Sequence, residues 1–237
     1  MSQSLDVPKL DAHLAMLGRL ASTLSHEIRN PLGALFVLTD VLAEELQQPA
    51  ADHSAQVAQI LADMKIALSR MDDLVRDYLS LARLAELRLE PMELGVIVEI
   101  YAQEMHKQCA CRGITLRLEG LSSLGQVHLH QNAFRRVLIN LIQNAIDAMP
   151  QGGELTLCGG QSSSWACLAV QDTDEGIPEN QLSQLFVPFR TTKSNGTGLG
   201  LYVVREILAA HGGAITVTST PSIGTTCLVM LPLAASE

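Results

Sequence analysis

Apolar residues recur at intervals of three, four and seven along the first part of the chain. One run extends from Leu10 to Leu46 and a second from Val57 to Leu81. Each run predicts a long helix with an apolar stripe, and the first is close to a heptad repeat. Two antiparallel helices cannot bury stripes this wide alone, whereas pairing with a second copy gives a four-helix bundle. The pattern therefore predicts a helical hairpin in a homodimer.

Prolines indicate a kink within the first helix and the places where the two helices end. Pro31 predicts a kink in the first helix, and the segment Gln48–Asp52 predicts the turn between the two helices. The helical pattern ends near Glu90-Pro91. We therefore expect an all-α hairpin over residues 1–89 and a second domain over residues 90–237.

A third helical pattern covers Phe134–Pro150 and contains two asparagines on one side. Asn140 and Asn144 lie one turn apart, although asparagine is a poor helix former. Their amide oxygens are hard ligands of the kind that nucleotide-bound Mg²⁺ accepts. Solvated or capping asparagines are the alternative explanation. The apolar positions of this helix are Leu138, Ile142, Ala145 and Met149.

Three further motifs follow in order. Val170–Pro178 is an apolar strand that runs into an acidic turn, and Leu185–Lys193 follows it. Gly196–Leu201 is glycine-rich and precedes the helical pattern Tyr202–Leu208. Glycines before a helix let backbone N–H groups approach phosphate, although a plain turn has the same composition. The spacing fits neither the Walker A loop nor the dinucleotide fingerprint.

Together these four segments resemble the N, G1, F and G2 boxes of the catalytic domain of sensor histidine kinases, over residues 130–232. The resemblance implies an ATP-binding α/β sandwich of the GHKL (Bergerat) type. In that fold a mixed sheet lies under helices, and a flexible lid lies between the F and G2 boxes.

The resemblance also implies roles for individual residues. Asn144, helped by Asn140, would hold Mg²⁺, and Asp172 would accept a hydrogen bond from the adenine amino group. Lys193 would lie in the lid near the phosphates. The implied nucleotide-binding residues are Asn140, Asn144, Asp172, Gly176, Lys193, Gly196, Thr197, Gly198, Leu199 and Gly200.

The segment Ser25–Leu32 lies within the first helical pattern. It resembles the H box of histidine kinases, and its wording is close to the nitrogen-regulator type. The resemblance implies that His26 is the phosphoacceptor and that Glu27 fixes its tautomer. Asn30 matches the position that orients water for dephosphorylation in many relatives. A structural histidine and a solvated Glu27 are the alternatives.

The implied reaction is autophosphorylation of His26 by ATP and transfer to an aspartate of a separate response regulator. The sequence shows no receiver-like segment after the catalytic domain, and the stretch before His26 is too short for a sensor domain. We therefore expect either a fragment of a longer kinase or a signal that arrives through a partner or the short N-terminal extension.

The resemblance fails at one position. The family pattern Asp-x-Gly-x-Gly reads Asp172-Thr173-Asp174-Glu175-Gly176, so Asp174 replaces a glycine. Aspartate can be tolerated there, since it visits left-handed backbone at modest cost. Alternatively its bulk and charge impair nucleotide binding, which would leave a dimeric scaffold or a regulator phosphatase. Membership among chaperone, gyrase and mismatch-repair ATPases is a third hypothesis, against which the His26 segment argues.

Composition and charge argue against some classes of partner and location. A net charge of −9 argues against nucleic acid. No apolar run reaches the length of a membrane span, and the N-terminus lacks the apolar core of a signal peptide. Five cysteines without paired metal spacing indicate a reduced, cytoplasmic protein. Cys109-Ala110-Cys111 is the one close pair, and ordinary packing explains it better than metal binding or redox sensing.

Overall fold

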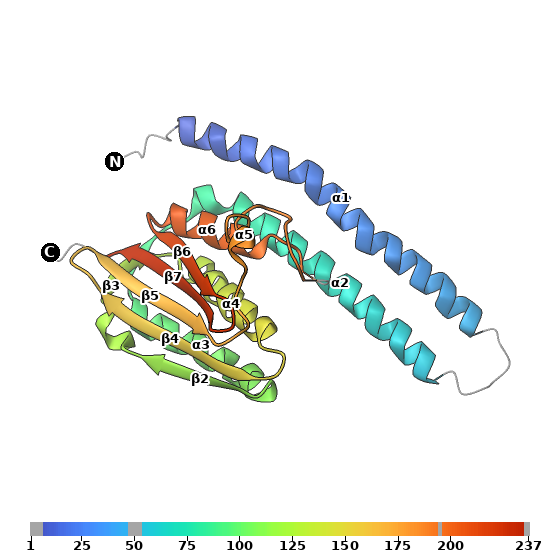
Figure 1. Cartoon of the computed structure of the whole chain (residues 1–237). Helices are drawn as coiled ribbons and strands as arrows, with labels where there is room; N and C mark the ends of the chain where they lie inside the picture. The colour runs from blue at the N-terminus through green and yellow to red at the C-terminus, as the bar shows by residue number, and fades with distance from the viewer. Residues whose placement is uncertain (1–6, 47–53, 194–195, 235–237) are drawn as a thin grey trace. The chain divides into compact units, whose positions relative to one another are not determined.

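The computed structural model describes residues 7–46, 54–193 and 196–234 (Figure 1). Contacts divide the chain into two compact units. The helical unit comprises Met1–Ala85 together with Thr191–Thr197. The sheet unit comprises Glu86–Arg190 and Gly198–Glu237.

The helical unit contains the two predicted helices, α1 (Val7–Glu45) and α2 (Ser54–Ala82), which pack against each other (Figure 1). The predicted hairpin is thus confirmed, while the predicted turn Gln48–Asp52 lies outside the described residues. Pro31 does not end α1, which continues to Glu45. A change of axis at Pro31 stays a prediction.

The single hairpin leaves much of its apolar surface exposed. Leu20 and Ile60 are buried, but Phe36 and Val37 remain 65% and 62% exposed. An apolar surface of this extent usually marks an interaction site. The other large exposed apolar side chains from Leu32 onward are Leu32, Val41 and Leu46, followed by Leu61, Ile66, Leu68, Val75 and Leu79 on α2.

The sheet unit is built on a five-stranded mixed sheet (Figure 1). Its strands, in spatial order, are β2 (Ile114–Glu119), β4 (Gly153–Gln161), β5 (Trp165–Asp172), β7 (Gly224–Pro232) and β6 (Ala214–Thr220). β2 pairs with β4 in parallel, and the other pairings are antiparallel. A separate antiparallel pair joins β1 (Glu90–Glu93) to β3 (Gln126–Leu129).

Three helices cover one face of this sheet: α3 (Leu94–Cys111), α4 (Gln131–Ala148) and α6 (Gly200–Ala210) (Figure 1). Alternate residues of the strands are buried, as expected for a sheet with one covered face. This is the predicted α/β sandwich. The buried strand residues include Leu155, Leu157, Leu168, Val170, Val229 and Leu231. Short helices complete the unit: η1 (Leu84–Glu86), η2 (Leu121–Ser123) and α5 (Glu179–Leu182).

A buried histidine fixes α6 relative to α4. His211, at the end of α6, accepts a hydrogen bond from the backbone N–H of His130 through Nε2 at 3.0 Å. Its Nδ1 donates to the carbonyl of Ile207 at 2.7 Å. These two bonds require the neutral ring, and burial lowers the pKa of His211. His130 in turn caps the start of α4 by accepting from the N–H of Ala133.

Candidate functional site

The two asparagines of α4 lie beside its buried stripe. Leu138 and Ile142 are fully buried, as the apolar pattern predicts, whereas Asn140 and Asn144 are half-buried. Asn140 lies next to the start of α6, because a Cβ built on Gly200 would be 3.1 Å from its Oδ1. The fold thus brings two predicted site residues from distant motifs together.

The glycine-rich segment leads directly into α6, which begins at Gly200, two residues before the predicted helical pattern Tyr202–Leu208. Leu199 is buried, and its side chain makes no capping hydrogen bond. Gly198 has a φ of +68°, and a Cβ there would lie 2.6 Å from the carbonyl carbon of Phe189. The N–H of Phe189 donates to the carbonyl of Gly198 at 2.9 Å. Only glycine fits this close approach of two backbones.

The residues just before Gly198 belong to the other compact unit. Lys193, Gly196 and Thr197 belong to the segment Thr191–Thr197, which clusters with the helical unit. Lys193 is exposed, and its carbonyl accepts a hydrogen bond from the N–H of Gly196 at 3.3 Å. Thr197 is half-buried. The assembly of this segment with Gly198–Gly200 into one phosphate loop stays a prediction.

Asp172 ends β5 at the predicted strand-to-loop junction. Its Oδ1 accepts hydrogen bonds from the N–H groups of Thr225 at 2.9 Å and Asp174 at 3.4 Å. Burial, reinforced by the negative charge of Asp174, raises the pKa of Asp172 to about 7. A carboxyl group is therefore fixed at the end of the strand and titrates near neutrality.

Asp174, which replaces the family glycine, fits an ordinary backbone conformation. Within the described part of the chain, Phe189 and Ser222 are the non-glycine residues with positive φ. The left-handed position in this loop is Gly176, with φ +74° and a built Cβ only 2.4 Å from the carbonyl oxygen of Thr220. The backbone therefore demands glycine at residue 176 and accepts aspartate at residue 174.

Two hydroxyl residues of this site were not predicted. Thr225 donates its hydroxyl to Oδ1 of Asp174 at 3.3 Å. Ser219 accepts from the N–H of Ile177 at 2.7 Å and donates to the carbonyl of Gly224 at 3.0 Å. No local signal identifies either residue, since both depend on the register of β6 and β7 relative to β5.

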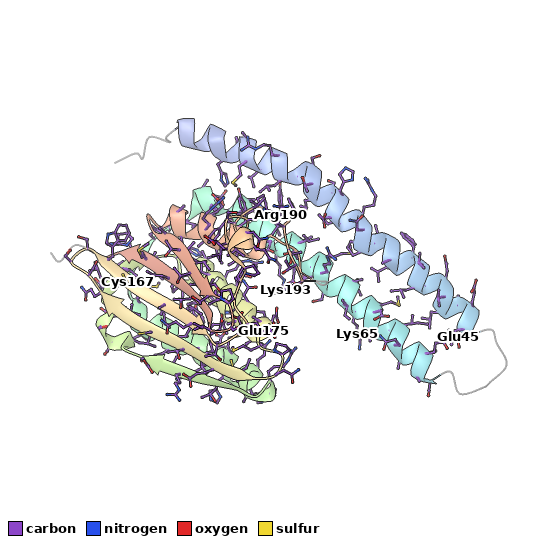
Figure 2. The ribbon with its side chains drawn as sticks, in the orientation of Figure 1. Glu45, Lys65, Cys167, Glu175, Arg190 and Lys193 are labelled. Carbon is purple, nitrogen blue, oxygen red and sulfur yellow. The ribbon has the colours of Figure 1, made fainter. Side chains whose placement is uncertain are left out.

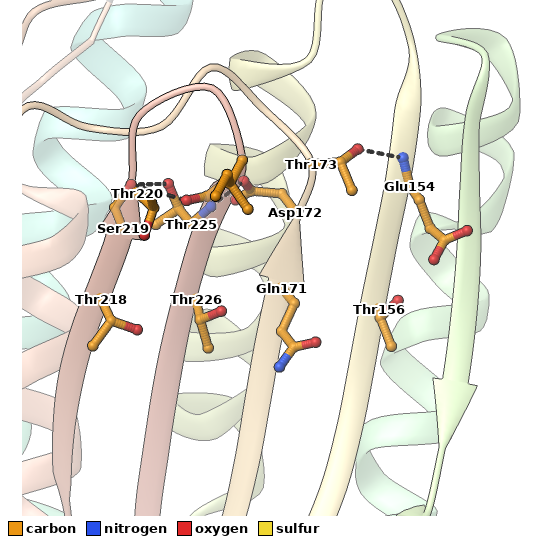
Figure 3. A pocket seen from close by; sticks show the side chains of 12 residues that line it. Glu154, Thr156, Gln171, Asp172, Thr173, Thr218, Ser219, Thr220, Thr225 and Thr226 are labelled. Atoms are coloured by element: carbon orange, nitrogen blue, oxygen red, sulfur yellow. Dashed lines mark hydrogen bonds between the residues drawn. The ribbon is translucent and has the colours of Figure 1, made fainter.

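A cleft of about 340 Å³ lies at the same end of the sheet (Figure 3). Apart from Asp172, it includes none of the predicted nucleotide-binding residues. Thr156, Gln171, Thr226 and Thr218 line it and occupy one register row across four strands. The cleft is therefore distinct from the region around Asn140 and Gly200.

His26 lies in the middle of α1 and is exposed, as is Asn30 one turn later. Residues four apart share one side of a helix. Glu27 is half-buried and forms an ion pair with Arg70 of α2, with 3.5 Å between Oε2 and the guanidinium nitrogen. Arg70 was not predicted, because its meeting with Glu27 depends on the register of the hairpin.

The described residues contain neither a cluster of metal-ligating side chains nor a membrane-spanning helix. Throughout residues 7–46, 54–193 and 196–234, no three His, Cys, Asp or Glu side chains gather in a way that suits a metal ion. A metal at this site would therefore rely on amide oxygens and on the ligand's own oxygens. No helix in those ranges is both long enough and apolar enough to cross a bilayer.

Comparison with known proteins gives two family matches. Residues 129–235 match the histidine kinase-, DNA gyrase B- and HSP90-like ATPase family, and residues 16–87 match the His Kinase A (phospho-acceptor) domain. Sensor histidine kinase ZraS of Escherichia coli O157:H7 is 34% identical over 228 residues, which cover 96% of this chain. The chain belongs to the sensor histidine kinase family.

Other family members agree with this assignment. Sporulation kinase A of Bacillus subtilis is 30% identical over 225 residues, or 92% of this chain and 35% of that protein. The chain spans 49% of the length of the ZraS protein. It therefore spans about half of ZraS and about a third of sporulation kinase A.

Solved histidine kinases share the fold. The catalytic domain of histidine kinase ThkA is 27% identical, with a TM-score of 0.56 over 61% of this chain and 95% of that domain. ThkA in complex with the response regulator TrrA gives a TM-score of 0.75 over 94% of this chain and 64% of ThkA, at 23% identity. That second likeness concerns the fold alone.

Proposed function

We propose that this chain is an ATP-dependent protein-histidine kinase that phosphorylates His26 and passes the phosphoryl group to an aspartate of a separate response regulator. One observation carries the proposal: the chain presents an exposed H-box histidine on α1 and, in its sheet unit, Asn140 packed against Gly200 at the start of α6. The family match supports both halves.

The nucleotide belongs to the sheet unit. Asp172 accepts a hydrogen bond from the adenine amino group. The N–H groups at the start of α6 face the phosphates, because a helix N-terminus favours negative charge. The half-buried amides of Asn140 and Asn144 suit Mg²⁺, since amide oxygens are ligands of that ion. When bound, Mg²⁺ neutralises the phosphate charges. Lys193, Gly196 and Thr197 complete the phosphate loop.

The reaction takes place at His26. One imidazole nitrogen attacks the γ-phosphorus, an N–P bond forms, and the bond from phosphorus to the ADP oxygen breaks. Glu27 accepts the hydrogen bond of the other ring nitrogen, which fixes the tautomer and stabilises the charge that develops. Glu27 must share its carboxylate with Arg70 while it does so. Asn30, on the same side of α1, orients water when the chain acts as a phosphatase of its regulator.

Partners follow from the hairpin. Residues 1–89 form the dimerisation and phosphoacceptor domain, and residues 90–237 the ATP-binding domain. The exposed apolar side chains of α1 and α2 support a homodimer, since burial of such side chains drives association. Membership of the sensor histidine kinase family supports a response regulator as the partner. Use of ATP and five free cysteines support a cytoplasmic location.

Labelling with γ-phosphate-labelled ATP and Mg²⁺ tests the proposal. The chain should gain label that is lost in acid and kept in alkali, as expected for an N–P bond. His26→Gln should abolish this label while nucleotide affinity stays unchanged. His106→Gln, at an exposed histidine of α3, is the matched control and should label normally. Label that survives in His26→Gln would exclude His26 as the acceptor.

A further inference from the structure

The end of β5 and the start of β7 are joined by a hydrogen bond from the N–H of Thr225 to Asp172 (Figure 3). Glu175, on the first of these loops (Figure 2), accepts a hydrogen bond from the N–H of Ser222 at 2.8 Å. A Cβ on Gly224 would lie only 2.0 Å from the carbonyl oxygen of Asp172. The backbones are therefore in direct contact, and a side chain that joins them affects both.

Asp174 is such a side chain. Its Oδ1 accepts from the N–H of Gly176 at 2.6 Å, within its own loop, and from the hydroxyl of Thr225 at 3.3 Å, on β7. Thr225 also donates its backbone N–H to Asp172. Thr225 is thus hydrogen-bonded to both carboxylates: its N–H donates to Asp172, and its hydroxyl, which also lies 3.0 Å from the hydroxyl of Ser219, donates to Asp174. A glycine at residue 174 has no side chain with which to make either bond.

The two carboxylate oxygens of Asp172 have different hydrogen-bond partners. Both hydrogen bonds of this carboxylate among the described residues are to Oδ1, from Thr225 and Asp174. Oδ2 is therefore the oxygen left to accept a donor from a ligand. The bonds to Oδ1 fix the direction in which Oδ2 points.

We propose that Asp174 is a positioning residue for base recognition: it fixes Asp172 through Thr225, and its charge acts on the carboxylate that makes the adenine contact. This inference rests on the proposed nucleotide-binding function. It also reverses the expectation that Asp174 obstructs the site, because the carboxylate is bonded to the loop framework.

The adenine contact depends on pH because it needs an unprotonated oxygen of Asp172. Oδ1 already accepts two N–H groups, so Oδ2 is the oxygen at which protonation removes an acceptor for the ligand. A protonated Oδ2 is a donor and faces another donor, the adenine amino group. With the pKa of Asp172 raised to about 7 by burial and by Asp174, the contact fails below neutral pH. For the same reason the ionised form costs folding stability, which falls as pH rises from the ordinary pKa of 3.8 through about 7.

The other groups near Asp172 do not supply this charge. Cys227 of β7 has its thiol pKa raised to about 12, first by burial and then by the two aspartates, so it stays neutral. Glu154 of β4 lines the neighbouring cleft and is paired with Arg117 at 2.8 Å. Asp174 is the charged residue that acts on the pKa of Asp172.

Two charged residues of α4 have hydrogen-bond partners within the helix layer. On α4, Arg135 pairs with Glu104 of α3 at 2.7 Å, and Asp147 accepts from Gln143 at 2.7 Å. These bonds lie within the helix layer and do not involve the loop after β5.

A comparison of two nucleotides isolates the base contact. Adenosine and inosine diphosphate carry the same phosphates, but inosine has a carbonyl in place of the amino group. We would measure both affinities from pH 6 to pH 8.5 on the whole chain and on three variants. Asp174→Asn keeps an acceptor for Gly176 and removes the charge, Asp174→Gly removes both, and Glu99→Gln removes a charge from an exposed position of α3.

The unmodified chain should prefer adenosine diphosphate at pH 8 and lose up to tenfold of that preference for each pH unit below about 7. Asp174→Asn should keep the preference to lower pH. Asp174→Gly should show the same shift of the pH profile and, at pH 8, a preference about fivefold weaker than that of the unmodified chain. Glu99→Gln should match the unmodified chain. Circular dichroism would check that each variant is folded.

Contrary outcomes are distinct. If Asp174→Gly binds adenosine diphosphate more tightly, Asp174 is an obstruction and the inference is wrong. If Asp174→Asn has the same pH profile as the unmodified chain, its charge does not act on the contact, and the inference is also wrong while the proposed function stands. If no folded version binds either nucleotide at any pH, the proposed function fails and the role of Asp174 fails with it.

Discussion

Two carboxylates that we assign to hydrogen bonding with a ring, Glu27 and Asp172, have opposite surroundings. Glu27 lies on a single helix, is about one-quarter exposed, and is paired with Arg70 at 3.5 Å. Asp172 lies in a network of backbone N–H groups at the end of a buried strand. A long ion pair leaves a side chain free to change partner, whereas two backbone donors do not.

The difference corresponds to two tasks. A residue that assists a transfer must adjust as the phosphoryl group arrives and leaves, whereas a residue that recognises a base benefits from a fixed position. Variants of the hairpin should therefore change the rate of labelling without changing nucleotide affinity. Variants of the sheet unit should change affinity first.

The largest effect is expected for Glu27→Gln. Loss of the carboxylate removes the partner that fixes the imidazole tautomer, so the initial rate of His26 labelling should fall about 100-fold. Nucleotide affinity should not change. Glu44→Gln, at an exposed position of α1, is the control. An unchanged rate would make Glu27 a surface charge, and an equal fall in affinity would contradict the separation of tasks.

Asn144→Ala should have the next largest effect. Removal of an amide ligand should weaken binding of the Mg²⁺–nucleotide complex about tenfold in a calorimetric titration. Chelation of Mg²⁺ should abolish the difference between the variant and the unmodified chain. Gln131→Ala, at the exposed start of α4, should bind normally. A loss that persists without Mg²⁺ would indicate that Asn144 supports the helix rather than the metal.

Gly200→Ala should have a smaller effect. The new methyl group would lie 3.1 Å from Oδ1 of Asn140, so this amide must shift, and nucleotide affinity should fall about threefold. Gly160→Ala introduces a methyl group that meets no atom within 4 Å and serves as the control. Equal affinities for the two variants would show that the position of Asn140 is not critical.

Arg70→Met should have the smallest effect. It removes the competitor for Glu27 while it keeps an apolar side chain, so labelling should become about twofold faster with affinity unchanged. The stability change should stay below about 1 kcal/mol, because the pair is partly exposed. Slower labelling would instead make Arg70 a residue that positions Glu27 for the reaction.

Local patterns predicted the elements well and the contacts between them poorly. The helices around His26 and Asn140 follow from apolar periodicity, and a helix after the glycine-rich segment follows from the pattern Tyr202–Leu208. The bond from Thr225 to Asp174 and the pair of Glu27 with Arg70 join residues 51 and 43 positions apart in the sequence. Such contacts depend on strand and hairpin register, which no short motif encodes.

Aspartate at residue 174 shows the same limit. From the motif alone, the missing glycine left two alternatives: an aspartate that is tolerated, or impaired nucleotide binding. The backbone angles show that residue 176, and not residue 174, needs the left-handed conformation. Departure from a family pattern is thus informative only when the conformation at that residue is known.

The exposed apolar side chains of the hairpin have a thermodynamic consequence. In the proposed homodimer a second copy covers this surface, which links the folding of α1 and α2 to mass action, so the folded fraction of the hairpin should rise with protein concentration. The sheet unit, with a core of its own between sheet and helices, carries no such dependence. On dilution, therefore, the chain would lose its phosphoacceptor before it loses its nucleotide-binding fold.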